Sequence, residues 1–451
     1  MNKKDFKLCM QQGRGLCHLV LKSEKDIAKY KDIVLWGCLH NLSYDTQCEG
    51  VRAEYVYDLT TYFGDENYFL TPIIKAFESL PQRRDWLFEH FSEQLSLFAK
   101  NGNERAKEAL ERKYDQLFSV LLNKRRFCNY DFERDNFERL CVALLPLGDT
   151  EDKFKIVCDL GRLFRENPHY DCDYFDWFCF SIENDLGKET LQEYLKCNSP
   201  QNEDLKSFYQ SYFQLEEVKS NRKLMRKPVE APSVEAIKEE VSSSGKLSPY
   251  SRVSFSRNAE EEERKSLAQE AIKEVDLDKK AELLSVFQHH NFPLPHDIII
   301  EYANSSHERL RDVSLDLLTN CQSDVVRDYA LSLMAEENLK AHALKMLLCN
   351  YTLEDKQFLL GELSKLKVTY DDESDWHDIG FKILNLFDAE RDLPKEFLFY
   401  IYNTTLCSCC RRSAVLALDK RQWLTEDIIE ECRFDSNKNI KEYINQNHPK
   451  E

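Results

Sequence analysis

Two segments in the second half of the chain repeat one pattern sixteen residues apart. Residues 308–318 read ERLRDVSLDLL, residues 324–334 read DVVRDYALSLM, and residues 339–348 and 411–418 return to the theme. In each segment, apolar and small side chains recur with the three- and four-residue spacing of one helical face. The pattern predicts successive amphipathic helices of about 12 residues, separated by short polar connections.

Helices joined by such short connections pack antiparallel to their neighbours in the sequence. When many of them stack, the core continues from one repeat to the next and an α-solenoid results. We therefore predict an all-α fold that is an antiparallel helical-repeat solenoid, an α-α superhelix. The alternative is a closed all-α bundle in which the self-similarity is accidental.

The small number of turn-forming residues agrees with a helical chain. The 451 residues include 12 glycines and 12 prolines, where average usage would give roughly 30 and 20. β-Sandwiches, barrels and long disordered tails need many more. In the first half, apolar stripes predict further helices over residues 83–98 and 105–122.

One segment interrupts this pattern. Residues 216–265 hold three of the twelve prolines, a serine cluster and an acidic run, with few large apolar side chains. Because such a segment can bury little, we predict a charged linker or surface excursion. The predicted organisation is an N-terminal helical body over residues 1–215, this linker, and a C-terminal repeat body over residues 266–451.

The balance of charges restricts the partners. Lys and Arg number 62 and Asp and Glu 80, which gives a formal charge of −18. The average surface therefore repels phosphate, which disfavours nucleic acid and anionic membranes as partners. No apolar run is long enough to cross a membrane, and the N-terminus lacks a signal-peptide core. We expect a cytoplasmic protein whose 16 cysteines are mostly free thiols.

Some of these segments resemble a known family. The Arg-x-x-Ala-Leu-x-Leu-like sequences at residues 327–333 and 411–418 are similar to HEAT-type repeats. WGCLHN and YDTQCEGVR within residues 36–52, CSCCR at 407–411 and ECRFDSN at 431–437 resemble an uncharacterised group of bacterial HEAT-repeat proteins. The resemblance covers both ends of the chain. It implies a HEAT-like fold and no established activity.

Four cysteines are candidates for a metal site. Cys407, Cys409 and Cys410 lie close together in the sequence, and Cys432 follows downstream. Zinc needs four soft or nitrogen ligands in a tetrahedron. Since a second Cys-x-x-Cys pair is missing, we assign no metal, and Cys407 and Cys410 are expected to pack against the core. A redox thiol beside Arg411 at the helix start is a further possibility.

An acid–acid–base line is a candidate binding site. Asp45, Glu49 and Arg52 have the spacing of one helical face. Such a line could bind a charged group of a ligand or hold a general acid and base. The alternative is a series of exposed salt bridges within one helix.

A second group of acids precedes a predicted helix. Asp171, Asp173 and Asp176 adjoin Trp177, and oxygen ligands at this spacing could hold Ca²⁺ or Mg²⁺. The glycine and glutamate of an EF-hand are not in place, and an Asp-rich first turn of a helix is a sufficient explanation. We predict Asp173, Asp176 and Trp177 as candidate binding residues.

Motifs typical of nucleotide-binding enzymes and hydrolases are missing from the sequence, so we predict no cofactor and no catalytic residue. The favoured function is a non-enzymatic binding scaffold, which presents a concave surface to a protein or peptide with basic patches. The alternative is a nucleic-acid enzyme such as an alkylbase DNA glycosylase, because HEAT-like folds occur among them. The negative charge disfavours it. A bilin lyase, a class that also contains HEAT-like repeats, is a third hypothesis.

Overall fold

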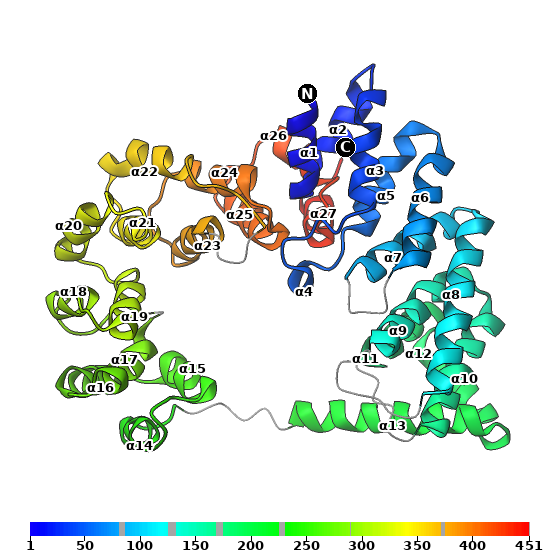
Figure 1. The fold of residues 1–451 in the computed structure, drawn as a ribbon, viewed down its shortest axis with the longest axis horizontal. Helices are drawn as coiled ribbons and strands as arrows, with labels where there is room; N and C mark the ends of the chain where they lie inside the picture. Colours follow the sequence, from blue (N-terminus) through cyan, green and yellow to red (C-terminus); the bar gives the residue numbers. More distant parts are fainter. Residues whose placement is uncertain are drawn as a thin grey trace. The chain divides into compact units, whose positions relative to one another are not determined.

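The computed structural model describes residues 1–80, 86–124, 132–167, 175–224, 231–288, 290–370 and 375–450, with the backbone alone for residues 216–224. Within these ranges every regular element is an α-helix or a 3₁₀ helix, and none is a strand (Figure 1). The predicted all-α class is confirmed. None of the helices in the described ranges combines the length and the apolar character needed to cross a membrane.

The chain divides into two compact units. Unit 1 contains Met1–Arg226, Leu406–Arg412 and Leu424–Glu451, and unit 2 contains Lys227–Thr405 and Ser413–Trp423. The first unit therefore takes its residues from both ends of the chain. The predicted division, with residues 266–451 as one body, differs because the last helices pack with the first ones.

In the part of unit 1 that the structure describes, there are thirteen consecutive α-helices and two from the end of the chain. They are α1 (Lys3–Gln12), α2 (Leu16–Ser23), α3 (Lys31–Cys38), α4 (Thr46–Glu49), α5 (Ala53–Thr60), α6 (Glu66–Ser79), α7 (Trp86–Lys100), α8 (Glu104–Leu122), α9 (Phe132–Leu144), α10 (Thr150–Glu166), α11 (Phe175–Leu186), α12 (Lys188–Asn198), α13 (Glu203–Leu224), α26 (Glu426–Cys432) and α27 (Lys438–Asn447). Its 3₁₀ helices are η1 (Ala28–Tyr30), η2 (Thr61–Phe63), η3 (Leu145–Leu147) and η4 (Ser199–Gln201).

Unit 2 holds the middle helices of the chain. They are α14 (Val234–Ser244), α15 (Pro249–Asn258), α16 (Glu261–Lys273), α17 (Leu277–Leu284), α18 (Asp297–Ala303), α19 (Glu308–Leu318), α20 (Asp324–Leu333), α21 (Lys340–Cys349), α22 (Lys356–Leu363), α23 (Asp375–Asp388) and α24 (Lys395–Thr404), with 3₁₀ helices η5 (Ser285–Phe287) and η6 (Leu353–Asp355). α25 (Ser408–Lys420) begins in unit 1 and continues in unit 2.

The repeated segments of the sequence form the helices that their pattern predicts. Residues 308–318 are α19, and residues 324–334 contain α20. Leu310 and Leu317 are buried in the first, as are Val326 and Leu333 in the second. The Ser323 side chain caps α20 by accepting the backbone N–H of Val326, which ends the short polar connection.

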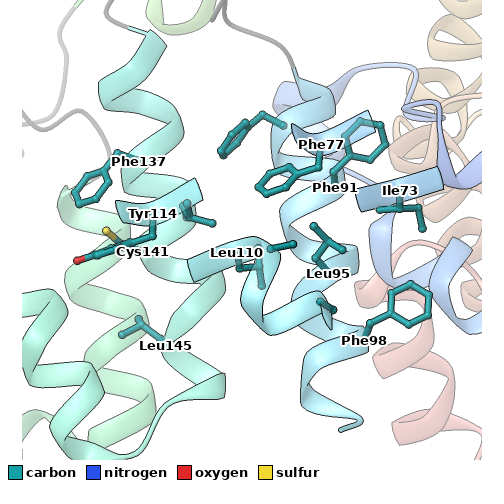
Figure 2. Packing of buried hydrophobic residues seen from close by; sticks show 14 of the residues in the cluster. Ile73, Phe77, Phe91, Leu95, Phe98, Leu110, Tyr114, Phe137, Cys141 and Leu145 are labelled. Carbon is teal, nitrogen blue, oxygen red and sulfur yellow. The ribbon is translucent and has the colours of Figure 1, made fainter. Parts of the chain in front are cut away.

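The core of unit 1 extends from α1 to α13, and one part of it lies among α6, α7, α8 and α9. Phe77, Phe91, Leu95, Leu110 and Phe137 are among its fully or almost fully buried side chains (Figure 2). On α7, Phe91, Leu95 and Phe98 follow the spacing of one helical face. This packing fixes the rotation of α7 about its axis and so decides which of its side chains reach the surface.

The segment predicted as a linker is helical where the structure describes it from residue 231 onward. It contributes α14, α15 and the start of α16. Val234, Ile237, Val241 and Phe255 are buried, so a few apolar side chains at helical spacing suffice to attach these short helices. The prolines and serines act as boundaries: Ser233 and Ser248 cap α14 and α15, and Pro249 opens α15.

Segments from the two ends of the chain meet in unit 1, where α1, α2, α26 and α27 lie together (Figure 1). We call this contact region, formed by residues 11–15, 48–52, 406–411 and 431–436, the terminal junction. Arg14 Nε is 2.7 Å from Glu431 Oε1, and the backbone N–H of Ser436 donates to the Gly13 carbonyl at 2.8 Å. Residues 48–52, 407–411 and 431–436 of this junction belong to three of the segments on which the family resemblance rests.

Candidate binding cleft

A cleft of about 210 Å³ opens on unit 1 where α5, α7, α9, α11 and α27 come together. Ionisable side chains dominate its polar lining. Its principal residues are Glu54, Glu89, Glu93, Arg139, Trp177 and Lys438.

α7 supplies one wall of the cleft. Glu89, Glu93 and Ser96 have the spacing of one helical face. A neighbouring face of α7 is anchored to the end of α3, because His90 Nε2 lies 3.3 Å from the Gly37 carbonyl and Gln94 Nε2 donates to the Cys38 carbonyl at 2.9 Å. Burial lowers the pKa of His90 to about 4, so this anchor is a neutral imidazole at physiological pH.

Two of the three glutamates are paired with cations. Glu89 forms an ion pair with Arg139, whose guanidinium also lies over the Trp86 ring, 4.6 Å from its centroid. Glu54 forms ion pairs with two lysines. Lys438 Nζ lies 2.9 Å from Glu54 Oε2, and Lys441 Nζ lies 3.0 Å from Glu54 Oε1. Although burial opposes ionisation of Glu54, hydrogen bonds from these lysines lower its pKa. Glu54 is therefore ionised at neutral pH.

Glu93 differs from the other two glutamates. Its side chain is partly buried and makes no hydrogen bond or ion pair with any residue that the structure describes. Burial raises its pKa to about 7, the charge of Glu54 adds to this effect, and Lys438 opposes it. Glu93 is thus a carboxyl group in a cleft, about half ionised at neutral pH, with hydrogen-bonding capacity left for a ligand.

Trp177 adds an aromatic surface to the cleft. It lies in the first turn of α11, and 36% of it is exposed. An indole face attracts cations, and the attraction strengthens where water is excluded. The cleft is smaller than the roughly 300–1,000 Å³ of typical small-molecule sites, so its size suits one long side chain better than a cofactor. Together, Glu93 and Trp177 offer a binding place for a lysine or arginine side chain.

The candidate residues Asp45, Glu49 and Arg52 do not share one helical face. Asp45 caps α4 by accepting the backbone N–H groups of Gln47 and Cys48. The helix ends at Glu49, and Gly50 follows with a φ of 69°, a conformation that favours glycine. The predicted continuous helix is therefore interrupted before Arg52.

Glu49 and Arg52 nevertheless form an ion pair, with 2.7 Å between Arg52 Nη2 and Glu49 Oε2. Their side chains are only 1% and 3% exposed, so this is a buried pair and not an exposed series of salt bridges. Arg52 also donates to the carbonyls of Leu406, at 2.7 Å, and Gln11. These contacts join segments of the terminal junction, which is a structural role.

The candidate cysteines lie in the terminal junction as well. Cys407 and Cys410 are buried, Cys409 is half-buried at the start of α25, and Cys432 is fully buried at the end of α26. The burial expected for Cys407 and Cys410 is confirmed. The structure adds Cys48, whose backbone carbonyl is 3.8 Å from the Cys409 sulfur. No disulfide joins the cysteines of the described ranges.

Of the candidates around α11, Asp173 and the neighbouring Asp171 lie outside the described residues. Asp176 is exposed in the first turn of α11, where a negative charge suits the positive end of the helix dipole. Trp177 follows it and lines the cleft. Trp177 is thus the candidate site residue that the structure brings to the cleft.

The sequence did not predict most residues of the cleft as site residues. Glu89 and Glu93, four residues apart beside an apolar stripe, were the visible local signal. Glu54, Arg139 and Lys438 come from three other helices, and their proximity has no counterpart in local spacing. Searches for relatives identify neither a matching family model, nor a matching curated protein, nor a matching solved structure.

Proposed function

We propose that the chain is a non-enzymatic binding scaffold, and that the cleft of unit 1 receives a basic side chain of a protein or peptide partner. The observation that carries this proposal is the combination of Glu93, which has no ion-pair partner among the described residues, with the exposed indole of Trp177 in one small cleft. Charge and cation–π attraction would act on the same ligand group.

The order of helix contacts supports a repeat architecture within unit 2. In unit 2, α17 contacts α16 and α19, α19 contacts α18 and α21, and α21 contacts α20 and α23. Neighbouring elements along the chain are thus neighbours in space, as in helical repeats. We propose that these helices form a HEAT-like solenoid, whose concave surface would offer contacts to the partner in addition to those of the cleft in unit 1.

The net charge of −18 supports a partner with basic patches, since complementary charge speeds encounter and favours binding. The nucleic-acid enzyme considered above gains no support from the cleft, because its glutamates repel phosphate. The cytoplasm remains the compartment that we propose, since a reducing environment suits described cysteines that form no disulfide.

The test is an affinity capture from native lysate with the wild-type chain, with Glu93→Gln and with Trp177→Ala. Glu108→Gln on α8 is the matched control, since the Glu108 side chain is 63% exposed and lies outside the cleft lining. We expect one stoichiometric partner that survives nuclease, binds the control normally and is weakened about tenfold or more in both cleft variants. Binding should also weaken as salt rises to physiological strength.

The proposal for the cleft is overturned if the partner binds all four proteins equally. Loss of the captured material on nuclease treatment would overturn the protein or peptide as partner. Salt-independent binding would contradict the role of charge.

A further inference from the structure

Four cysteines of unit 1 gather at the start of α25. Three come from the sequence Cys407-Ser408-Cys409-Cys410, and the fourth is Cys48, more than 350 positions away, in α4. We call Cys48, Cys407, Cys409 and Cys410 the thiol cluster. It is independent of the cleft described above, because it shares no residue with the cleft lining.

The contacts within the cluster are short. The sulfur atoms of Cys407 and Cys410 lie within 4.8 Å of each other. The backbone N–H of Cys410 is directed at the Cys407 sulfur, 3.5 Å away. The Cys409 thiol donates to the Cys48 carbonyl at 3.8 Å, which brings the two chain segments together. The Cys407 sulfur lies beside both the Cys409 and the Cys410 thiols, each of which forms a hydrogen bond with it.

The surroundings suit thiolate ligands. α25 has 13 residues, and its dipole favours negative charge at the N-terminus, where Cys409 and Cys410 lie. Burial increases from Cys48, which is exposed, through half-buried Cys409 to Cys407 and Cys410. An ion could therefore enter from the surface and reach ligands that are shielded from solvent.

Without a cation the cluster resists multiple ionisation. Hydrogen bonding to the Cys407 sulfur, followed by burial, raises the pKa of both Cys409 and Cys410. A thiophilic cation would compensate the repulsion between neighbouring thiolates, and each coordinating thiol would release its proton to the solvent as the metal–sulfur bond forms.

We propose that the thiol cluster binds a thiophilic d¹⁰ cation, Zn²⁺ or Cu⁺, through the sulfur atoms of Cys407, Cys409 and Cys410. Soft thiolates select these ions over hard cations. Three sulfur ligands satisfy trigonal Cu⁺, whereas Zn²⁺ takes four ligands in a tetrahedron. Cys48, whose backbone carbonyl accepts the Cys409 thiol, is the neighbouring cysteine that would supply the fourth. The number of required cysteines therefore distinguishes the two ions.

The experiment uses the full chain, reduced and freed of metal, in competition titrations with a zinc chelator and separately with a Cu⁺ chelator. We expect one tightly bound equivalent of one of these ions. Cys409→Ser should weaken binding by about 100-fold or more. Cys197→Ser is the matched control, because Cys197 is an exposed cysteine on α12, and its metal affinity should equal that of the wild type.

Cys48→Ser separates the two ions: the binding of Zn²⁺ should be lost with Cys48, and the binding of Cu⁺ should be retained. For the zinc arm, Co²⁺ substitution should produce a thiolate-to-cobalt charge-transfer band in the wild type and none in Cys409→Ser. Circular dichroism verifies that each variant is folded.

A measurement on the wild-type chain keeps the proposal testable if a variant does not fold. Bound metal should protect Cys407, Cys409 and Cys410 from alkylation, as read by peptide mass spectrometry, while Cys197 remains reactive. The proposal is overturned if neither ion competes with its chelator, if Cys409→Ser binds as tightly as the wild type, or if metal leaves the alkylation of the three cysteines unchanged.

Discussion

Arg411 illustrates how much of unit 1 depends on single side chains. Its side chain is fully buried, and its Nε and Nη2 atoms lie 2.7 and 2.8 Å from the two carboxylate oxygens of Asp435. It also donates to the carbonyl of Gln12 at 2.6 Å and to that of Gly13 at 3.3 Å. A planar guanidinium can satisfy all three groups at once, whereas an ammonium cannot reproduce this geometry.

Replacement of Arg411 should destabilise unit 1 strongly. Arg411→Met leaves the Asp435 carboxylate buried without its cation, which costs about 3–5 kcal/mol in the free energy of unfolding. Arg412→Met, which changes the exposed neighbouring arginine, should cost less than about 0.5 kcal/mol. Urea-induced unfolding followed by circular dichroism measures both. Equal unfolding midpoints for the two variants would refute the assigned role of Arg411.

The raised pKa of Glu93 predicts a pH-dependent stability. Because its pKa rises from 4.5 to about 7 in the folded chain, the folded state binds more protons than the unfolded state between these values. The free energy of unfolding should therefore fall as pH rises through this window. Glu93→Gln removes the effect and should be more stable than the wild type at pH 8, by about 1 to 3 kcal/mol, and equally stable below pH ~4.5.

Denaturant unfolding of both proteins at several pH values measures this difference. Asp58, whose pKa burial raises to about 6, is present in both proteins, so its contribution cancels. Glu108→Gln should show no such pH-dependent gain. A difference between wild type and Glu93→Gln that is constant with pH would contradict the prediction.

At the scale of elements, close packing of two helices depends on a glycine. α10 and α13 approach each other at Gly161, where an added Cβ atom would lie 1.9 Å from the backbone oxygen of Asp204. Arg165 of α10 also pairs with Asp204, with 2.8 Å between Nε and Oδ1. The ion pair and the short backbone distance both depend on the absence of a side chain at position 161.

Gly161→Ala should therefore push α10 and α13 apart and lower the stability by about 1–3 kcal/mol. The matched control is Gly361→Ala in α22, where the described structure leaves open space around the added atom. That substitution should be neutral or stabilising by up to about 1 kcal/mol, since alanine favours helix more than glycine does. Thermal unfolding followed by circular dichroism compares them. A tolerated Gly161→Ala would exclude this close approach.

At the scale of the whole molecule, unit 1 is discontinuous in sequence. Arg14, Glu54 and Arg411 take their partners from the last 30 residues, namely Glu431, the lysines 438 and 441, and Asp435. The charged partners cluster in α26, α27 and the turn between them. The first helices of the chain thus require the last ones for their stability.

A chain truncated after Trp423 should have less stable N-terminal helices. The truncation removes these acidic and basic partners and leaves buried cations and a carboxylate uncompensated. Hydrogen exchange followed by mass spectrometry should show peptides of α1, α2 and α5 exchanging about 100-fold faster or more. Peptides of α19 and α20 in unit 2 should change little. Unchanged protection of the N-terminal helices would argue against a unit 1 built from both ends of the chain.

Local sequence determined the secondary structure of this protein. Residues 308–318 are helical as predicted, residues 324–334 contain the predicted α20, and the polar connection between them ends at the capping Ser323. A helix closes its hydrogen bonds within four residues and buries one face, so periodicity and caps predict it. The same local reasoning missed the break at Gly50, because two short helices and one longer helix share similar spacing.

Only the tertiary structure decided which distant residues meet. The Cys48 carbonyl accepts the Cys409 thiol, and Arg411 forms an ion pair with Asp435. Glu54 and Glu93 line the same cleft. No spacing in the sequence predicts these pairs. Each depends on how whole helices pack and on which helix faces remain exposed after the core has formed. Burial then sets the chemistry: Glu93 holds its proton to about pH 7 because packing, and not its neighbours in the sequence, removes its water.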